Sequence, residues 1–267
     1  MKKVLSLLAA FAFGMLLFAS PASAQSATIT LIHGIPDTDV DVAVGGEIVF
    51  EGFSFGETQD LSSFAGQTLP GVQVVVAGTD TVAIDAGDVA LPASGNFSVI
   101  AHLDADGNPA IGVFENDTSA IAAGQGRIVV RHAAAAPAVD ILANGDVAFA
   151  NVANGAEGSA DLAAGTISVS VVPAGATEPV VIGPADIPVT EGTSLIVYAV
   201  GSLDDGTLTV LDQSITGLGS APTAVNSGNS PIAADSSNAT PIFLVGVGAA
   251  ALIAGVFATR RFAAVRS

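Results

Sequence analysis

The sequence predicts an all-β protein with two tandem antiparallel β-sandwich domains of the immunoglobulin-like kind. Short runs rich in Val, Ile, Thr and Phe alternate with Gly, Asn, Asp and Pro from about residue 26 to 216. No stretch of this region carries the apolar stripe of an amphipathic helix. The same motifs also recur 99 residues apart, which predicts two copies of one domain. A copy of about 95 residues is long enough for one sandwich core.

The expected strands are short apolar runs bounded by turn residues. In the first copy they cover residues 28–32, 40–44, 47–53, 71–77, 97–103 and 110–115. In the second copy they cover residues 126–131, 139–143, 147–152, 166–172, 194–200 and 207–212.

The duplication is clearest in an element near the start of each copy. LIHGIPDTDVDVAV (31–44) stands against VRHAAAAPAVDILA (130–143). The histidine and the aspartate could form a metal site or a catalytic pair, or they could tie down the turn between two strands. Recurrence in both copies favours the structural role, because scaffold residues must recur in every copy. The residues of this structural motif are His33, Pro36, Asp41, His132, Pro137 and Asp140.

The N-terminal part of the chain predicts export followed by the two domains. Lys2 and Lys3, an apolar run and a small-x-small site at 22–24 are typical of a signal peptide over residues 1–24. The two β-sandwich domains are expected at residues 26–122 and 124–217.

The C-terminal part predicts a membrane anchor on a stalk. Residues 218–240 are small and polar, which is typical of a flexible linker. Residues 242–258 are uncharged and mostly apolar, and arginines follow in 259–267, so we expect a transmembrane helix with a basic cytoplasmic tail. A sorting signal is the alternative, although no LPxTG-type pentapeptide precedes the apolar run.

The charge distribution excludes several classes of partner. All 25 acidic residues lie between Asp37 and Asp235, where the only basic residues are Arg127 and Arg131, so this stretch has a formal charge of −23. Such a surface repels nucleic acids and anionic headgroups. The chain has no cysteine and therefore no disulfides. We expect no cofactor, and the expected partners are an unknown cell-envelope or extracellular ligand and, through the C-terminal helix, the membrane.

Two local motifs raise the possibility of a catalytic site or a metal site. GFSFG (52–56) matches the nucleophile elbow of hydrolases around Ser54, but the residues that follow make a poor helix. Asp104, Asp106 and Glu115 partly match the spacing of a calcium loop, although the Asp-Gly pair is also a hairpin signal. An envelope hydrolase and a weak calcium- or cation-binding module are therefore the alternatives.

VVRHAAAAPAVDILANGDVAFANV, in the second copy, resembles an uncharacterised family of secreted bacterial domains catalogued as domain of unknown function 4397. Its members carry a signature like V-x-H-A-S-P-D-A-P-A-V-D-V, followed by a short turn and an apolar strand. Ala134-Ala135 replace the usual Ser-Pro, and Gly34 and Thr38 depart from the signature in the first copy. FSFGETQDL (53–61) also fits the family. The resemblance covers both copies and implies an exported, β-rich and often tandem architecture, but it implies no activity.

Taken together, these observations predict a bacterial, membrane-anchored cell-surface protein whose N-terminal part is extracellular. The expected role is structural, adhesive or binding, and not catalytic.

Overall fold

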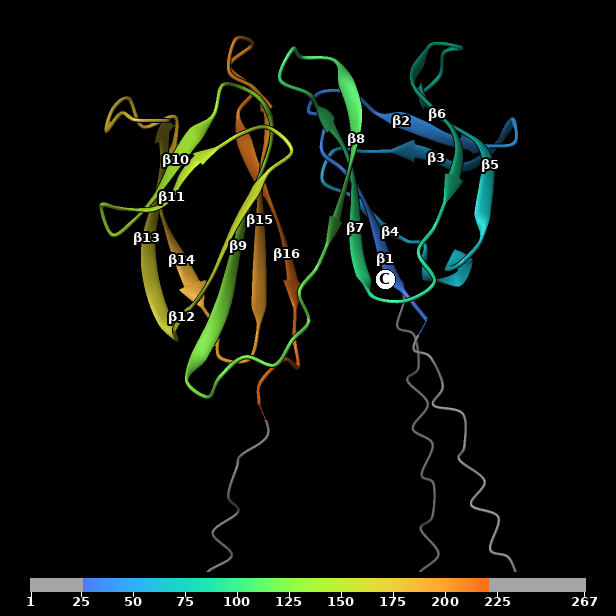
Figure 1. Ribbon diagram of the computed structural model, residues 1–267. Helices are drawn as coiled ribbons and strands as arrows, with labels where there is room; N and C mark the ends of the chain where they lie inside the picture. The colour runs from blue at the N-terminus through green and yellow to red at the C-terminus, as the bar shows by residue number, and fades with distance from the viewer. Residues whose placement is uncertain (1–25, 221–267) are drawn as a thin grey trace, which may run out of the picture. The chain divides into compact units, whose positions relative to one another are not determined.

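The computed structural model describes residues 26–220, which form four four-stranded β-sheets (Figure 1). The all-β prediction is confirmed for these residues. The predicted signal peptide, the transmembrane helix, the basic tail and nearly all of the stalk lie outside them. Within residues 26–220, no helix has the length and hydrophobicity needed to cross a membrane.

Strands β1 to β8, here called the first half, form two sheets. The first inner sheet has the order β4-β1-β7-β8, and the first outer sheet has the order β3-β2-β5-β6. A 3₁₀ turn, η1 (Ser62–Phe64), follows β4. The strands are β1 (Thr28–His33), β2 (Val40–Val44), β3 (Glu47–Phe53), β4 (Thr58–Asp60), β5 (Thr68–Val76), β6 (Val82–Ala90), β7 (Asn96–Leu103) and β8 (Pro109–Glu115).

Strands β9 to β16, here called the second half, repeat this topology, so that β9 corresponds to β1 and β16 to β8. The second inner sheet has the order β12-β9-β15-β16, and the second outer sheet has the order β11-β10-β13-β14. The strands are β9 (Gln125–Ala135), β10 (Val139–Ala143), β11 (Asp146–Val152), β12 (Glu157–Ala163), β13 (Gly165–Pro173), β14 (Ile182–Val189), β15 (Ser194–Ser202) and β16 (Thr209–Ile215).

The sheets are mainly antiparallel, but the prediction of purely antiparallel sheets is wrong for one strand pair in each half. β1 lies parallel to β7, and β9 lies parallel to β15. Parallel neighbours need a long crossover between them. Here the crossover is the whole outer sheet, because β2, β3, β5 and β6 all lie between β1 and β7 in the chain.

Within each half, the inner and outer sheets face each other across an apolar core, as in a β-sandwich. In the first half, Ile29 of β1 shares a cluster with Phe50 of β3 and Leu69 of β5. In the second half, Ile128 of β9 packs in one cluster with Ile141 of β10 and Val171 of β13.

A third core joins the two halves through the opposite faces of their inner sheets. Ile32, Ile100 and Phe114 of the first half cluster with residues of the second half that include Ile196 and Tyr198. The inner sheets are therefore covered on both faces. This explains why β9 is buried at every position but its two ends, and such doubly covered strands read as near-continuous apolar runs. Both halves belong to one compact unit.

Because the two halves share a core, we expect them to unfold in a single cooperative transition. Ile196→Ala, at a side chain only 1% exposed, should destabilise this transition as a whole by about 2–5 kcal/mol. Calorimetry combined with urea denaturation measures both effects. Val147→Ala, on the exposed face of β11, is the control and should change stability little. Two separate transitions in the native protein would contradict the expectation.

Candidate functional site

The two motif histidines each bind a backbone carbonyl within their own turn. Nε2 of His33 lies 2.6 Å from the carbonyl oxygen of Thr38, and Nε2 of His132 lies 3.0 Å from that of Pro137. A carbonyl oxygen can only accept a hydrogen bond, so Nε2 carries the proton in both rings. Each histidine therefore holds closed the turn that leads from an inner sheet to the outer sheet.

The two motif aspartates also bind backbone. Oδ1 of Asp41 accepts a hydrogen bond from the amide of Gly52, and Oδ1 of Asp140 accepts one from Asn151, both at 2.7 Å. Gly52 and Asn151 both have positive φ, 63° and 54°, at the irregular ends of β3 and β11. Oδ2 of Asp140 accepts a further bond from the amide of Gly175 at 2.8 Å. In both halves the aspartate thus fixes a bulge next to the turn that the histidine closes. The proline of each motif lies in that same turn.

Ser54 lies in a turn between two strands. Its hydroxyl oxygen is 3.4 Å from the carbonyl oxygen of Gly52, and its amide donates to Oε2 of Glu57 at 2.9 Å. A nucleophile elbow needs a helix after the turn, whereas here β4 follows. The structure brings none of the motif histidine nitrogens into a hydrogen bond with Ser54 within the described residues.

The three weak calcium candidates are not brought together. Oδ1 of Asp104 accepts hydrogen bonds from the amides of Asp106 and Asn108 at 2.9 and 2.8 Å, which shape the β7–β8 hairpin turn. Glu115 pairs with Phe97 at the opposite end of that hairpin, about 20 Å away at the usual rise per strand residue. Among residues 26–220, no group of three or more His, Cys, Asp or Glu side chains is placed to hold a metal ion.

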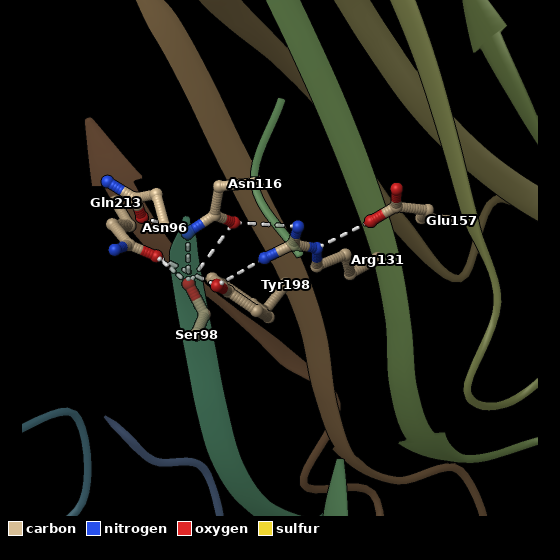
Figure 2. A network of polar contacts seen from close by, with 7 residues as sticks. All are labelled: Asn96, Ser98, Asn116, Arg131, Glu157, Tyr198 and Gln213. Carbon is tan, nitrogen blue, oxygen red and sulfur yellow. Dashed lines mark hydrogen bonds and ion pairs between the residues drawn. The ribbon is translucent and has the colours of Figure 1, made fainter. Parts of the chain in front are cut away.

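A buried polar network crosses from one half to the other (Figure 2). Arg131, only 1% exposed, is at its centre. Its guanidinium donates to Oε2 of Glu157 at 2.7 Å, to the Tyr198 hydroxyl at 2.8 Å and to Oδ1 of Asn116 at 2.8 Å. The guanidinium carbon also lies 4.5 Å from the centre of the Phe114 ring, within range of a cation–π interaction. The arginine belongs to the second half, whereas Phe114 lies in β8 of the first half and Asn116 comes directly after that strand.

The same network continues into hydroxyl and amide groups on both sides. The Tyr198 hydroxyl and the Ser98 hydroxyl both donate to Oε1 of Gln213, at 2.8 and 2.7 Å. Asn116 donates from Nδ2 to Oδ1 of Asn96 at 2.7 Å. Burial raises the pKa of Tyr198, although the charge of the nearby arginine opposes that shift. Tyr198 is therefore a neutral donor at physiological pH.

The other arginine of this region is also fully engaged. Arg127 binds Asp161 through Nε at 2.7 Å and Asp117 through Nη1 at 2.8 Å. Sequence reasoning noted both arginines only as charges. Their isolation in a largely apolar strand, within a strongly acidic part of the chain, was the one signal that they are buried and paired.

The main feature that sequence reasoning missed is an apolar cavity of about 490 Å³ between the sheets of the first half. Ligand pockets in proteins typically have volumes of this order. Sheet residues such as Val42, Val74 and Val99 line its walls, and Asp60 is the charged member of the lining. Three apolar lining residues are strongly exposed, Val49 at 50%, Phe64 at 39% and Val113 at 61%, so the cavity reaches the surface.

The matching space of the second half is occupied by side chains. The ring of Phe149 lies so close to Gly158 that a Cβ atom there would clash with it. The first half has Gln59 at that position, since both residues pair with the central strand, opposite Leu31 and Val130. The side chain of Gln59 excludes a phenylalanine ring from the place that the Phe149 ring has in the second half. Phe50, the corresponding residue of the first half, lies on the cavity wall instead.

The two halves also differ in the length of one edge strand. β12 pairs with β9 over seven residues, and its Leu162 packs into the second core. β4 pairs with β1 over only three residues, after which the chain turns away through η1. The first half thus has a shorter edge strand here, and Asp60, Leu61 and Phe64, at and just after the end of β4, line the cavity.

The fold and the cavity define a class of protein, a duplicated β-sheet protein in which one copy has an open apolar interior. Residues 27–142 match a protein-family model described as a domain of unknown function (DUF4397). This match agrees with the family resemblance seen in the sequence. The match runs from β1 through β10. No curated protein matches the chain.

Replacing Arg131 should weaken the contact between the halves. Arg131→Met removes the buried donor to Asn116 Oδ1 and to the Tyr198 hydroxyl oxygen, together with the ion pair to Glu157, so we expect a loss of about 3–5 kcal/mol in the free energy of unfolding. Urea denaturation measures it. Glu157→Gln is the control, because this half-exposed side chain can still accept from the guanidinium, and it should cost less than about 1 kcal/mol. Equal stability of Arg131→Met and the native protein would contradict this role.

The buried histidines should make the fold sensitive to mild acid. Burial lowers the pKa of His33, His102 and His132 below 6.5, and His102 lowers that of His132 further by charge repulsion. The folded state therefore binds fewer protons than the unfolded state. Stability is complete above pH 6.5 and falls as the pH drops below it.

Urea denaturation at pH 7.5 and 5.5 measures this loss. His102→Phe should reduce the slope of stability against pH by up to about 1.4 kcal/mol per pH unit, the value for one proton. Carboxylates with a lowered pKa, such as Asp140, change the stability with pH only below about pH 4. A stability that is constant or rises between pH 7.5 and 5.5 would contradict the assignment.

Proposed function

We propose that this protein is a non-catalytic binding protein of the bacterial cell surface, and that its first half holds an apolar ligand between its two sheets. In this proposal the chain is exported, anchored by residues 242–258 and displayed on the stalk, with two immunoglobulin-like domains outside the membrane. The signal-peptide pattern, the small polar linker and the apolar run with following arginines support that placement.

The single observation that carries the binding role is the cavity. It is large, almost wholly apolar and open to the surface, and it lies in one copy of a duplicated fold whose other copy fills the equivalent space. Protein interiors are normally close-packed, and an unfilled apolar space forfeits contacts. An apolar ligand would restore those contacts, which gives binding its driving force.

A binding role is better supported than catalysis or calcium binding. The motif histidines and aspartates are engaged with backbone groups, and Ser54 lacks the helix of a nucleophile elbow. Asp104 is used by its own hairpin turn. None of these groups lines the cavity.

A matched pair of substitutions tests the difference in core packing between the two halves. Val74 and Val171 occupy the same place in the two halves, because each pairs with the same position of its neighbouring strand, Val42 or Ile141, and each is 6% exposed. Val74→Phe should leave the free energy of unfolding unchanged or higher, because the added ring enters empty space. Val171→Phe should lower it by about 1–3 kcal/mol, since it overpacks a filled core.

The same variants test ligand binding. The neutral dye N-phenyl-1-naphthylamine, which fluoresces in apolar surroundings, should bind the native protein and the Val171→Phe variant, and Val74→Phe should abolish that binding. Fluorescence titration measures the affinity, and circular dichroism confirms that each variant is folded. If the dye binds all three proteins equally, or none of them, the proposed function is wrong.

A further inference from the structure

One charged side chain faces an otherwise apolar cavity. Asp60 is the last residue of β4, at the point where the chain leaves the first inner sheet, and it lines the cavity while remaining exposed to solvent. It therefore lies at an opening, where a ligand's polar end would remain in contact with water.

The carboxylate of Asp60 is held in place and ionised. Its Oδ1 accepts hydrogen bonds from both the amide, at 2.8 Å, and the hydroxyl of Ser62. These bonds lower the pKa of Asp60 below its ordinary value. Both bonds end on Oδ1, so Oδ2 is the oxygen through which Asp60 can meet a ligand.

No cation of the described residues is available to an anionic ligand. Residues 26–220 contain two basic side chains other than histidine, Arg127 and Arg131, and both are buried and held in ion pairs. Acidic residues dominate the remaining charge. A ligand with a negative headgroup would thus meet repulsion from Asp60 and from the surrounding surface.

We propose that the ligand of the cavity is a cationic amphiphile, with its apolar body between the sheets and its cationic group beside Asp60. This inference rests on the proposed binding function and specifies its ligand class. The apolar body supplies most of the affinity by leaving water, and Asp60 selects among headgroups. The same surface charge that repels an anion attracts a cation toward the opening.

The test uses the full chain in phosphatidylcholine nanodiscs, with protein-free nanodiscs as the background. Three probes share one decyl chain and differ only in the headgroup: decyltrimethylammonium, decyl glucoside and decyl sulfate. Each is titrated below its micelle-forming concentration against bound N-phenyl-1-naphthylamine. We expect the cation to displace the dye at the lowest concentration and the sulfate at the highest.

Asp60→Asn isolates the role of the carboxylate. Asparagine keeps an oxygen that can accept from Ser62, so the turn should persist. We expect the cation to bind about two- to fivefold more weakly to this variant, the range for an exposed ion pair, and the glucoside to bind unchanged. Asp80→Asn, an equal change of charge in the β5–β6 turn outside the cavity lining, is the matched control and should leave the cation's affinity unchanged.

The outcomes separate the two proposals. If the dye binds but the sulfate displaces it as well as the cation does, or if Asp60→Asn behaves like Asp80→Asn, the ligand class is wrong and the cavity remains a binding site. If neither the dye nor any decyl probe binds, the binding function itself fails. Loss of the cation's preference on raising the salt concentration would support the electrostatic origin.

Discussion

The fold depends on keeping one cation, Arg131, satisfied in the contact between two sheets that are each covered on both faces. A buried guanidinium is costly unless its donors are paired, and here a carboxylate, a phenol and an amide accept from it. Two of these partners, Glu157 and Tyr198, come from the second half and Asn116 comes from the first, so the arginine is satisfied only when the halves are joined. The apolar contacts around it give the joint its stability, and the hydrogen bonds give it one geometry.

The sequence revealed every central strand, and the strands that it missed all lie at sheet edges. Every expected strand exists, and β2, β3 and β10 have the expected bounds. The four unpredicted strands, β4, β6, β12 and β14, are each an edge of their sheet. An edge strand bonds to one neighbour and faces solvent, so stretches such as AIDAGDVA and EGSADLA carry few large apolar residues. The parallel pairing of β1 with β7 was likewise beyond prediction, because periodicity reports which face is buried and says nothing of the neighbour.

The candidate site could be predicted only in part from the sequence. The recurrence of His33 with Asp41 and of His132 with Asp140 shows in the sequence, and their backbone contacts follow from their place beside a turn. The cavity depends instead on a difference between aligned positions. Gln59 against Gly158 decides where a phenylalanine ring can lie, and that effect appears only once β4 and β12 are known to occupy the same edge. The residues that the two copies share therefore give no sign of the cavity.

The identical topology of the two halves has a consequence for how such a protein can change over time. An empty interior lowers stability, so a single domain that opened one would come closer to unfolding. Here the well-filled copy and the shared interface can offset that loss for the whole unit. Duplication thereby separates two demands that conflict in a lone domain: one copy keeps the architecture intact, while the other is free to vary its interior residues and explore new shapes.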